Sequence, residues 1–128
     1  MSTNAQRRLR AQSGKGPAVN LLKEQVMNKL IKDGKVAVLY SPGYGAGWYT
    51  WGDEPEMIFD MTIATMVLNG NTTDEIKAVA QLKWPDAYLG GADDLTVMWI
   101  DQGSLFRITE YDGDETVEVR DKLDWIIA

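Results

Sequence analysis

Residues 41–48 form the segment whose residue types best suit contact with a ligand. They read Ser-Pro-Gly-Tyr-Gly-Ala-Gly-Trp and follow a nearly all-apolar run over 36–40. The backbone N–H groups of a glycine-rich turn after a buried strand can approach a phosphate closely. However, the segment has no Gly-Lys-Ser/Thr and no helix is expected directly after it. It therefore matches neither the phosphate loop of nucleotide hydrolases nor the dinucleotide fingerprint.

Large aromatic residues crowd the same segment, with four of them in the eight positions 44–51. Aromatic faces beside a glycine backbone suit stacking on a base or a sugar, or anchoring of a protein contact. The alternative is a glycine-rich turn that lets these rings pack in the core. The predicted ligand or partner site consists of Tyr44, Gly45, Trp48, Tyr49 and Trp51, with Asp93 and Asp94 beside them.

Two acidic turns are weaker candidates for a metal site. Asp93 and Asp94 follow a Gly-Gly pair, and adjacent carboxylates at a turn could hold a divalent cation. More often such residues only form and solvate the turn. The run Asp-Gly-Asp-Glu at 112–115 lacks the twelve-residue spacing of a calcium loop and is typical of a hairpin turn. The sequence therefore predicts no metal site and no cofactor.

The chain contains neither histidine nor cysteine. This excludes disulfides, thiol nucleophiles, Cys/His zinc sites, Ser-His-Asp triads and histidine acid–base catalysis. Catalysis would have to use carboxylates, as in two-carboxylate glycoside hydrolases, or tyrosine, lysine or hydroxyl groups. We therefore expect a protein that is not an enzyme.

Apolar periodicity predicts an α+β fold, in which helices pack on one face of a mostly antiparallel sheet. A helix is expected over 17–33, where Val19, Leu22, Val26 and Leu30 keep a helical period and Gly34 ends it. A strand is expected over 36–40, and a second one over 48–51.

Two further helices and a C-terminal β-meander complete this prediction. Asp60 can cap a helix over 61–69, with Gly70 as its end. The run Thr-Thr-Asp-Glu at 72–75 is typical of a capping box for another helix, which Pro85 ends. Its expected buried face holds Ile76, Val79, Ala80 and Leu82. Strands are expected over 95–100, 105–111 and 115–120, and 123–127 should form a last strand or a docked tail.

Charge and composition predict two parts in the chain of 128 residues, a disordered basic arm over 1–15 and a single α+β domain over 16–128. The arm carries Arg7, Arg8, Arg10 and Lys15 and no acid, whereas the whole chain has a formal charge of −6. The arm could contact nucleic acid or another acidic partner. Alternatively, it is a solubilising tail or folds back on its own acidic body.

Three segments resemble a group of small uncharacterised proteins encoded by tailed bacteriophages. They are Val-Ala-Val-Leu-Tyr-Ser-Pro-Gly-Tyr-Gly-Ala-Gly-Trp-Tyr-Thr-Trp at 36–51, Gly-Gly-Ala-Asp-Asp-Leu-Thr-Val-Met-Trp at 90–99 and Phe-Arg-Ile-Thr-Glu-Tyr-Asp-Gly at 106–113. The resemblance covers about residues 35–128. It implies a setting, the cytoplasm of an infected bacterium or the virion, and no particular activity.

These observations predict a small non-enzymatic binding protein that captures a small ligand or a host protein through the glycine and aromatic loop. Two alternatives remain. The acidic body could occupy a nucleic-acid-binding surface of a host enzyme, with Asp and Glu in place of phosphates. The basic arm could instead hold a neighbour in a minor structural component of the virion. No signal peptide and no membrane span is expected.

Overall fold

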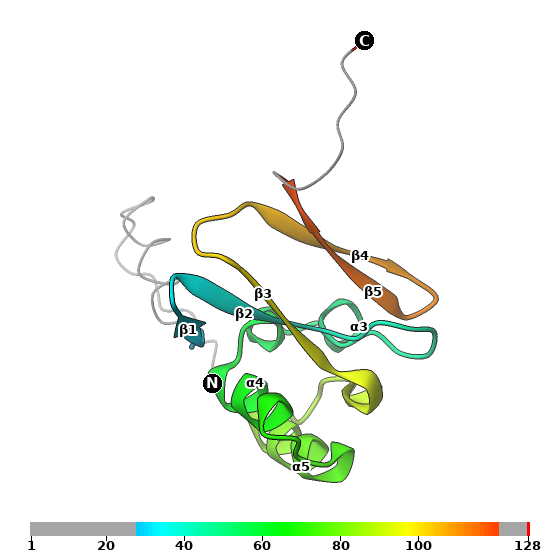
Figure 1. The fold of residues 1–128 in the computed structure, drawn as a ribbon. Helices are drawn as coiled ribbons and strands as arrows, with labels where there is room; N and C mark the ends of the chain where they lie inside the picture. Colours follow the sequence, from blue (N-terminus) through cyan, green and yellow to red (C-terminus); the bar gives the residue numbers. More distant parts are fainter. Residues whose placement is uncertain (1–27, 121–127) are drawn as a thin grey trace, which may run out of the picture.

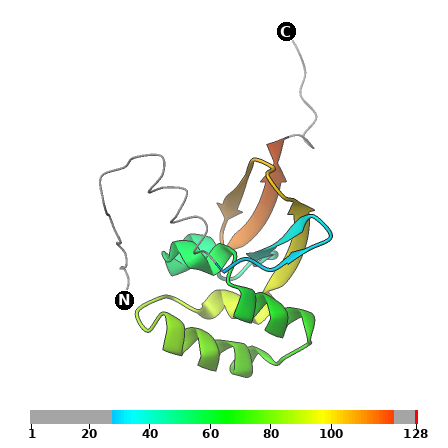
Figure 2. The same ribbon diagram turned by 90° about the vertical axis from the view of Figure 1, so that its left-hand side faces the viewer.

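The computed structural model describes residues 28–120 and Ala128. The basic arm and most of the helix predicted over 17–33 therefore lie outside the described residues. The same holds for 123–127, predicted as a last strand or a docked tail. The described chain builds three layers, which Figures 1 and 2 show from two sides. Helices cover one face of a three-stranded antiparallel sheet, and a β-hairpin covers the other face. The predicted α+β class is confirmed.

Strand β2 (Lys35–Tyr40) is the centre of the fold. It lies between β1 (Ile31–Lys32) and β3 (Thr96–Asp101), and both pairings are antiparallel. Ala37 and Leu39 face the helices, whereas Val36 and Val38 face the hairpin. Because both faces are covered, the strand is apolar at every inner position, as a central strand must be.

The helix layer follows its predicted caps. Helix α4 (Met61–Leu68) begins at Asp60, whose carboxylate accepts the Ile63 N–H at 3.0 Å. Helix α5 (Thr73–Lys83) begins with the predicted capping box of Thr72 and Glu75. Ile76 and Ala80 are buried, but the predicted inward position of Leu82 is wrong, since its side chain is 86% exposed.

The C-terminal strands are divided between two sheets. Strand β3 joins β2. Among the described strands, β4 (Phe106–Tyr111) and β5 (Asp114–Val119) pair only with each other. The chain reverses direction between β3 and β4, and the hairpin then packs with one face against the three-stranded sheet instead of extending it (Figure 1). The side chains between the hairpin and the sheet form a second core around Val36 and Val38. The predicted turn at Asp112-Gly113 is confirmed, with φ of 51° and 85° at its two residues.

Two element predictions are wrong. Residues 28–33, the described end of the predicted helix, form β1 and a tight turn at Asp33-Gly34, where both φ angles are positive. The Asp-Gly pair closes a hairpin with β2, and this outweighs the helical period of the apolar residues. The predicted strand over 48–51 is instead the helical turn α3 (Tyr49–Gly52). Short 3-10 helices, η1 (Pro55–Ile58) and η2 (Gly90–Asp94), complete the described elements.

Candidate functional site

Acidic residues of the β4–β5 hairpin hold the glycine loop of residues 41–47. The Ser41 N–H donates to Glu115 Oε1 at 2.8 Å, and the Gly43 N–H donates to Asp114 Oδ1 at 2.8 Å. The Gly45 N–H donates to the Asp112 carbonyl at 3.2 Å. Three N–H groups of the loop thus bind oxygens of the chain itself. The site that a phosphate would need is occupied internally, which opposes the phosphate-binding interpretation of this loop.

Glu115 is the most buried carboxylate among the described residues, with 1% of its surface exposed. Besides the Ser41 N–H, it accepts the backbone N–H of Thr50 at 2.8 Å and the Thr50 hydroxyl at 2.7 Å. Three donors compensate the cost of removing its charge from water. Their geometry also explains α3, because Glu115 binds the start of that helical turn and the end of β2 together.

Glu110 lies directly opposite Glu115 in the hairpin, on the same face. Its Oε2 accepts the Trp51 indole N–H at 3.2 Å and the Gly113 N–H at 2.8 Å. The two carboxylates therefore have different donors, although both bind residues of α3. This arrangement gives the pair a structural role in closing the hairpin tip and holding α3.

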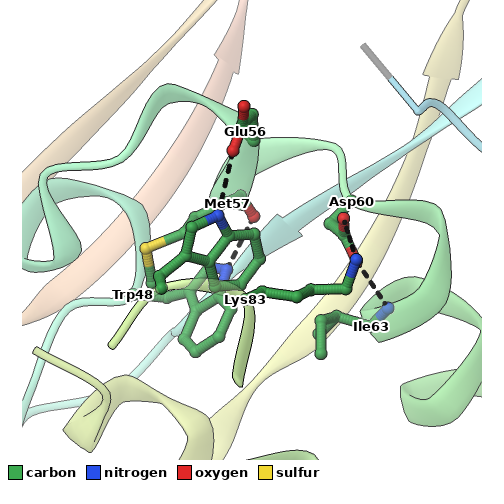
Figure 3. Close-up of polar contacts among 7 residues, drawn as sticks. Trp48, Glu56, Met57, Asp60, Ile63 and Lys83 are labelled. Carbon is green, nitrogen blue, oxygen red and sulfur yellow. Dashed lines mark hydrogen bonds and ion pairs between the residues drawn. The ribbon is translucent and has the colours of Figure 1, made fainter. Parts of the chain in front are cut away.

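Trp48 belongs to the core. Its side chain is fully buried, and its indole N–H donates to the Met57 carbonyl at 2.7 Å (Figure 3). Its ring meets that of Trp84 edge-on at 6.1 Å. The Trp84 indole N–H in turn donates to Glu56 Oε1 at 3.0 Å. The prediction that Trp48 contacts a ligand is therefore wrong. Trp48 directly precedes α3, as its N-cap residue.

An ion pair between a buried carboxylate and a partly exposed lysine lies beside these rings. Asp60 Oδ1 lies 3.3 Å from Lys83 Nζ, while Asp60 Oδ2 caps α4 (Figure 3). This contact links the beginning of α4 to the end of α5. Lys83 Nζ also lies 6.0 Å from the centroid of the Trp84 ring, and we assign the ion pair a structural role.

Exposed rings form two pairs that border the hairpin tip. Tyr44 and Tyr111 meet edge-on at 6.3 Å, with exposures of 70% and 74%. Trp51 and Tyr88 lie 5.5 Å apart and are both exposed. We call these four side chains the aromatic surface. Two of its members, Tyr44 and Trp51, are predicted site residues.

Sequence reasoning missed the other two members, Tyr88 and Tyr111. Each lies next to a recognised turn, since Tyr111 precedes Asp112-Gly113 and Tyr88 precedes the Gly90-Gly91 pair. An aromatic residue beside a turn was the available signal. Only the fold shows that these turns meet the loop of Tyr44 and the helical turn of Trp51.

The remaining predicted site residues take separate positions. Tyr49 is partly buried and packs against both cores. Gly45 is exposed in the loop with φ of 146°. Asp93 forms an exposed ion pair with Lys77 at 3.2 Å, and Asp94 is exposed at the end of η2. Within residues 28–120, no group of three or more acidic side chains is arranged to hold a metal ion.

No helix in the described part of the chain is long and apolar enough to cross a membrane. Comparisons with protein-family models, with curated proteins and with solved structures find no match for this chain. The function is therefore inferred from the exposure and arrangement of the rings in the aromatic surface.

Proposed function

We propose that this chain is a non-enzymatic binding protein that captures another protein through its aromatic surface. The observation that carries this proposal is the exposure of Tyr44, Trp51, Tyr88 and Tyr111 in two ring pairs around one hairpin tip. Tyrosine and tryptophan provide most of the binding energy in many protein interfaces, since they bury a large area at a small cost in side-chain entropy.

The surroundings of the rings are well fixed, which favours binding of a preformed partner surface. Glu110, Asp114 and Glu115 tie the loop of Tyr44, the helical turn of Trp51 and the hairpin together. A rigid surface loses less conformational freedom on association than a mobile one. Three N–H groups of the loop are already bonded within the chain, so a partner protein is a better candidate than a small anionic ligand.

A second candidate function rests on charge. Residues 16–128 carry a formal net charge of −10, because the whole chain has −6 and residues 1–15 carry +4. Such a body would be attracted to the basic surface of a nucleic-acid-binding enzyme and could block it. Under this hypothesis the enzyme belongs to a phage-infected bacterium, the setting that the sequence resemblance implies.

Affinity capture from a bacterial lysate tests the first function. The immobilised proteins are the natural chain, the double variant Tyr44→Ala/Tyr111→Ala, and Leu82→Ala as a control for an exposed apolar side chain elsewhere. We expect one or more proteins to bind the natural chain and the Leu82 variant. The amount of these proteins retained by the double variant should be lower by a factor of about ten or more, as expected for the loss of two aromatic anchors.

The outcome that contradicts this proposal is capture of the same proteins, in the same amounts, by all three. The ultraviolet spectrum of the purified protein supplies a separate check. A nucleotide retained by the natural chain and lost from the double variant would indicate a small-ligand site instead. If the proteins are lost only from variants in which surface carboxylates are neutralised, the second function is favoured, in which the acidic body blocks a nucleic-acid-binding enzyme.

A further inference from the structure

We propose that residues 1–15 of the same chain bind the aromatic surface and cover it until a partner displaces them. The inference rests on the proposed function, because it assigns a competitor to the same surface. Of the interpretations of the basic arm, this proposal adopts the one in which the arm folds back on its own acidic body.

The charges around the aromatic surface favour a basic occupant. The segments 36–76, 84–106 and 108–119 carry all four rings and contain no lysine or arginine. Among neighbouring cations, Lys77 pairs with Asp93 and Arg107 pairs with Glu118. The ring-bearing segments therefore present carboxylates without any cation of their own.

Three exposed carboxylates flank these rings along the chain. Asp53 lies two residues after Trp51, Asp86 two before Tyr88, and Asp112 directly after Tyr111. No hydrogen bond or ion pair engages these three side chains within the part of the chain that the structure describes. A ring beside a carboxylate suits arginine in particular, whose planar cation stacks on the ring and donates to the acid.

Residues 1–15 match this chemistry, with Arg7, Arg8, Arg10 and Lys15 and no acid. They are also within reach. The twelve residues 16–27 can span up to about 40 Å when extended. A compact body of the described length has a diameter of about 32 Å. Tethering gives such a segment a local concentration on the order of millimolar, so even weak contacts populate the bound state.

A spin label on the arm tests the proposal in the full chain. Since the sequence has no cysteine, Ser13→Cys provides a unique labelling site. We expect the label to broaden the amide signals of Tyr44, Asp112 and Gly113 and the indole signal of Trp51. Raising NaCl from 50 to 500 mM should reduce this effect about fivefold, because the Debye length shortens from roughly 14 to 4 Å.

The geometry of the fold makes this readout specific. The described chain begins beside β1, at the end of the molecule opposite the hairpin tip (Figure 1). A segment that made no contact would broaden the nearby turn at Asp33-Gly34 at least as strongly as the distant tip. Strongest broadening at the tip therefore supports the proposal, and strongest broadening near β1, or none at all, overturns it.

A matched pair of double variants separates a local site from overall charge. Asp53→Asn/Asp112→Asn removes two carboxylates at the surface, whereas Asp33→Asn/Asp74→Asn removes two exposed ones elsewhere. Asparagine tolerates the positive φ of Asp33, Asp53 and Asp112, so the fold should persist. Broadening at the tip should fall about fivefold in the first variant only, since surface charge contacts act locally. An equal decrease in both variants overturns the proposal.

The two proposals fail in different ways. If Tyr44→Ala/Tyr111→Ala loses captured proteins while the labelled arm never reaches the tip, the proposed function stands and this inference fails. If the arm binds the tip but capture is the same with and without the rings, the proposed function fails alone. If both hold, neutralising the arm with Arg7→Gln/Arg8→Gln/Arg10→Gln should increase capture.

Discussion

Glu115 receives its three hydrogen bonds from residues 65 to 74 positions away in the chain. At the scale of the residue, this carboxylate joins β5, the end of β2 and α3 at one buried point. Because of this position, a carboxylate of the protein itself, and not a bound anion, accepts a backbone N–H of the glycine loop.

Replacing Glu115 by alanine should lower the free energy of unfolding by about 3 kcal/mol, because buried N–H donors of Ser41 and Thr50 lose their acceptor. Glu115→Gln should cost less, since one oxygen remains. Urea unfolding measures both. The control is Glu118→Ala, in an exposed ion pair with Arg107, which should cost no more than about 1 kcal/mol. Equal effects at positions 115 and 118 would contradict the role of Glu115.

Trp48 and Trp51 lie three positions apart, but Trp48 is buried and Trp51 is exposed. Trp48→Ala should destabilise the protein by about 3–5 kcal/mol, because it empties a fully buried site. Trp51→Ala should cost less than about 1 kcal/mol, as its ring is partly exposed. Thermal unfolding of the two variants gives the comparison, with Tyr44→Ala expected near the natural chain. A larger loss at Trp51 than at Trp48 would contradict this assignment.

At the scale of the element, α5 shows how a cap determines both a boundary and a pH response. Glu75 accepts the Thr72 N–H at 2.9 Å and the Asn71 amide at 3.1 Å. These hydrogen bonds, the one from the Thr72 backbone first, lower the pKa of Glu75 below its ordinary value of 4.5. The capping contribution is therefore present above that value and is lost as the pH falls through the lower pKa of the folded state.

Glu75→Gln should reduce the dependence of stability on pH between about pH 5 and pH 3, because glutamine still accepts the Thr72 N–H but does not titrate. Urea unfolding at a series of pH values measures the slope. Asp74→Asn serves as the neighbouring control and should change the slope less. A slope that is unchanged in Glu75→Gln would contradict the assigned role of the carboxylate.

The close contact between η2 and the glycine loop requires a residue without a side chain at Gly91. A Cβ at Gly91 would lie 2.5 Å from the Gly47 carbonyl oxygen and 2.6 Å from Trp48 Cα. Both obstacles are backbone, so Gly91→Ala should cost about 2–3 kcal/mol by overpacking. Gly103→Ala meets open space and should cost only about 1 kcal/mol for its positive φ of 89°. Chemical unfolding that ranks them in reverse would contradict this packing.

At the scale of the whole molecule, three layers provide two cores on either side of β2. Residues 1–15 contain few apolar side chains, so they have little apolar surface to bury. Deleting residues 1–15 should therefore move the melting temperature by less than about 4 °C, the change expected for under 1 kcal/mol. Calorimetry measures the shift. A loss well beyond that range would show that the arm is part of the core structure.

The sequence by itself determined the features that depend on neighbours along the chain. The caps of α4 and α5, the central strand β2 and the turn at Asp112-Gly113 are all local, since each depends on side chains or backbone angles within a few residues. Tyr44 and Trp51 are exposed, and their part in binding stays a prediction.

Only the tertiary structure decided the features that depend on distant partners. The helical turn at Tyr49–Gly52 needs Glu115, the burial of Trp48 needs Met57 and Trp84, and the second sheet needs a core beneath it. The pairing of Tyr44 with Tyr111 likewise joins residues that no local pattern connects. Hydrogen bonds and burial at long sequence separation outweigh local propensity at these positions, because each local preference amounts to about 1 kcal/mol or less.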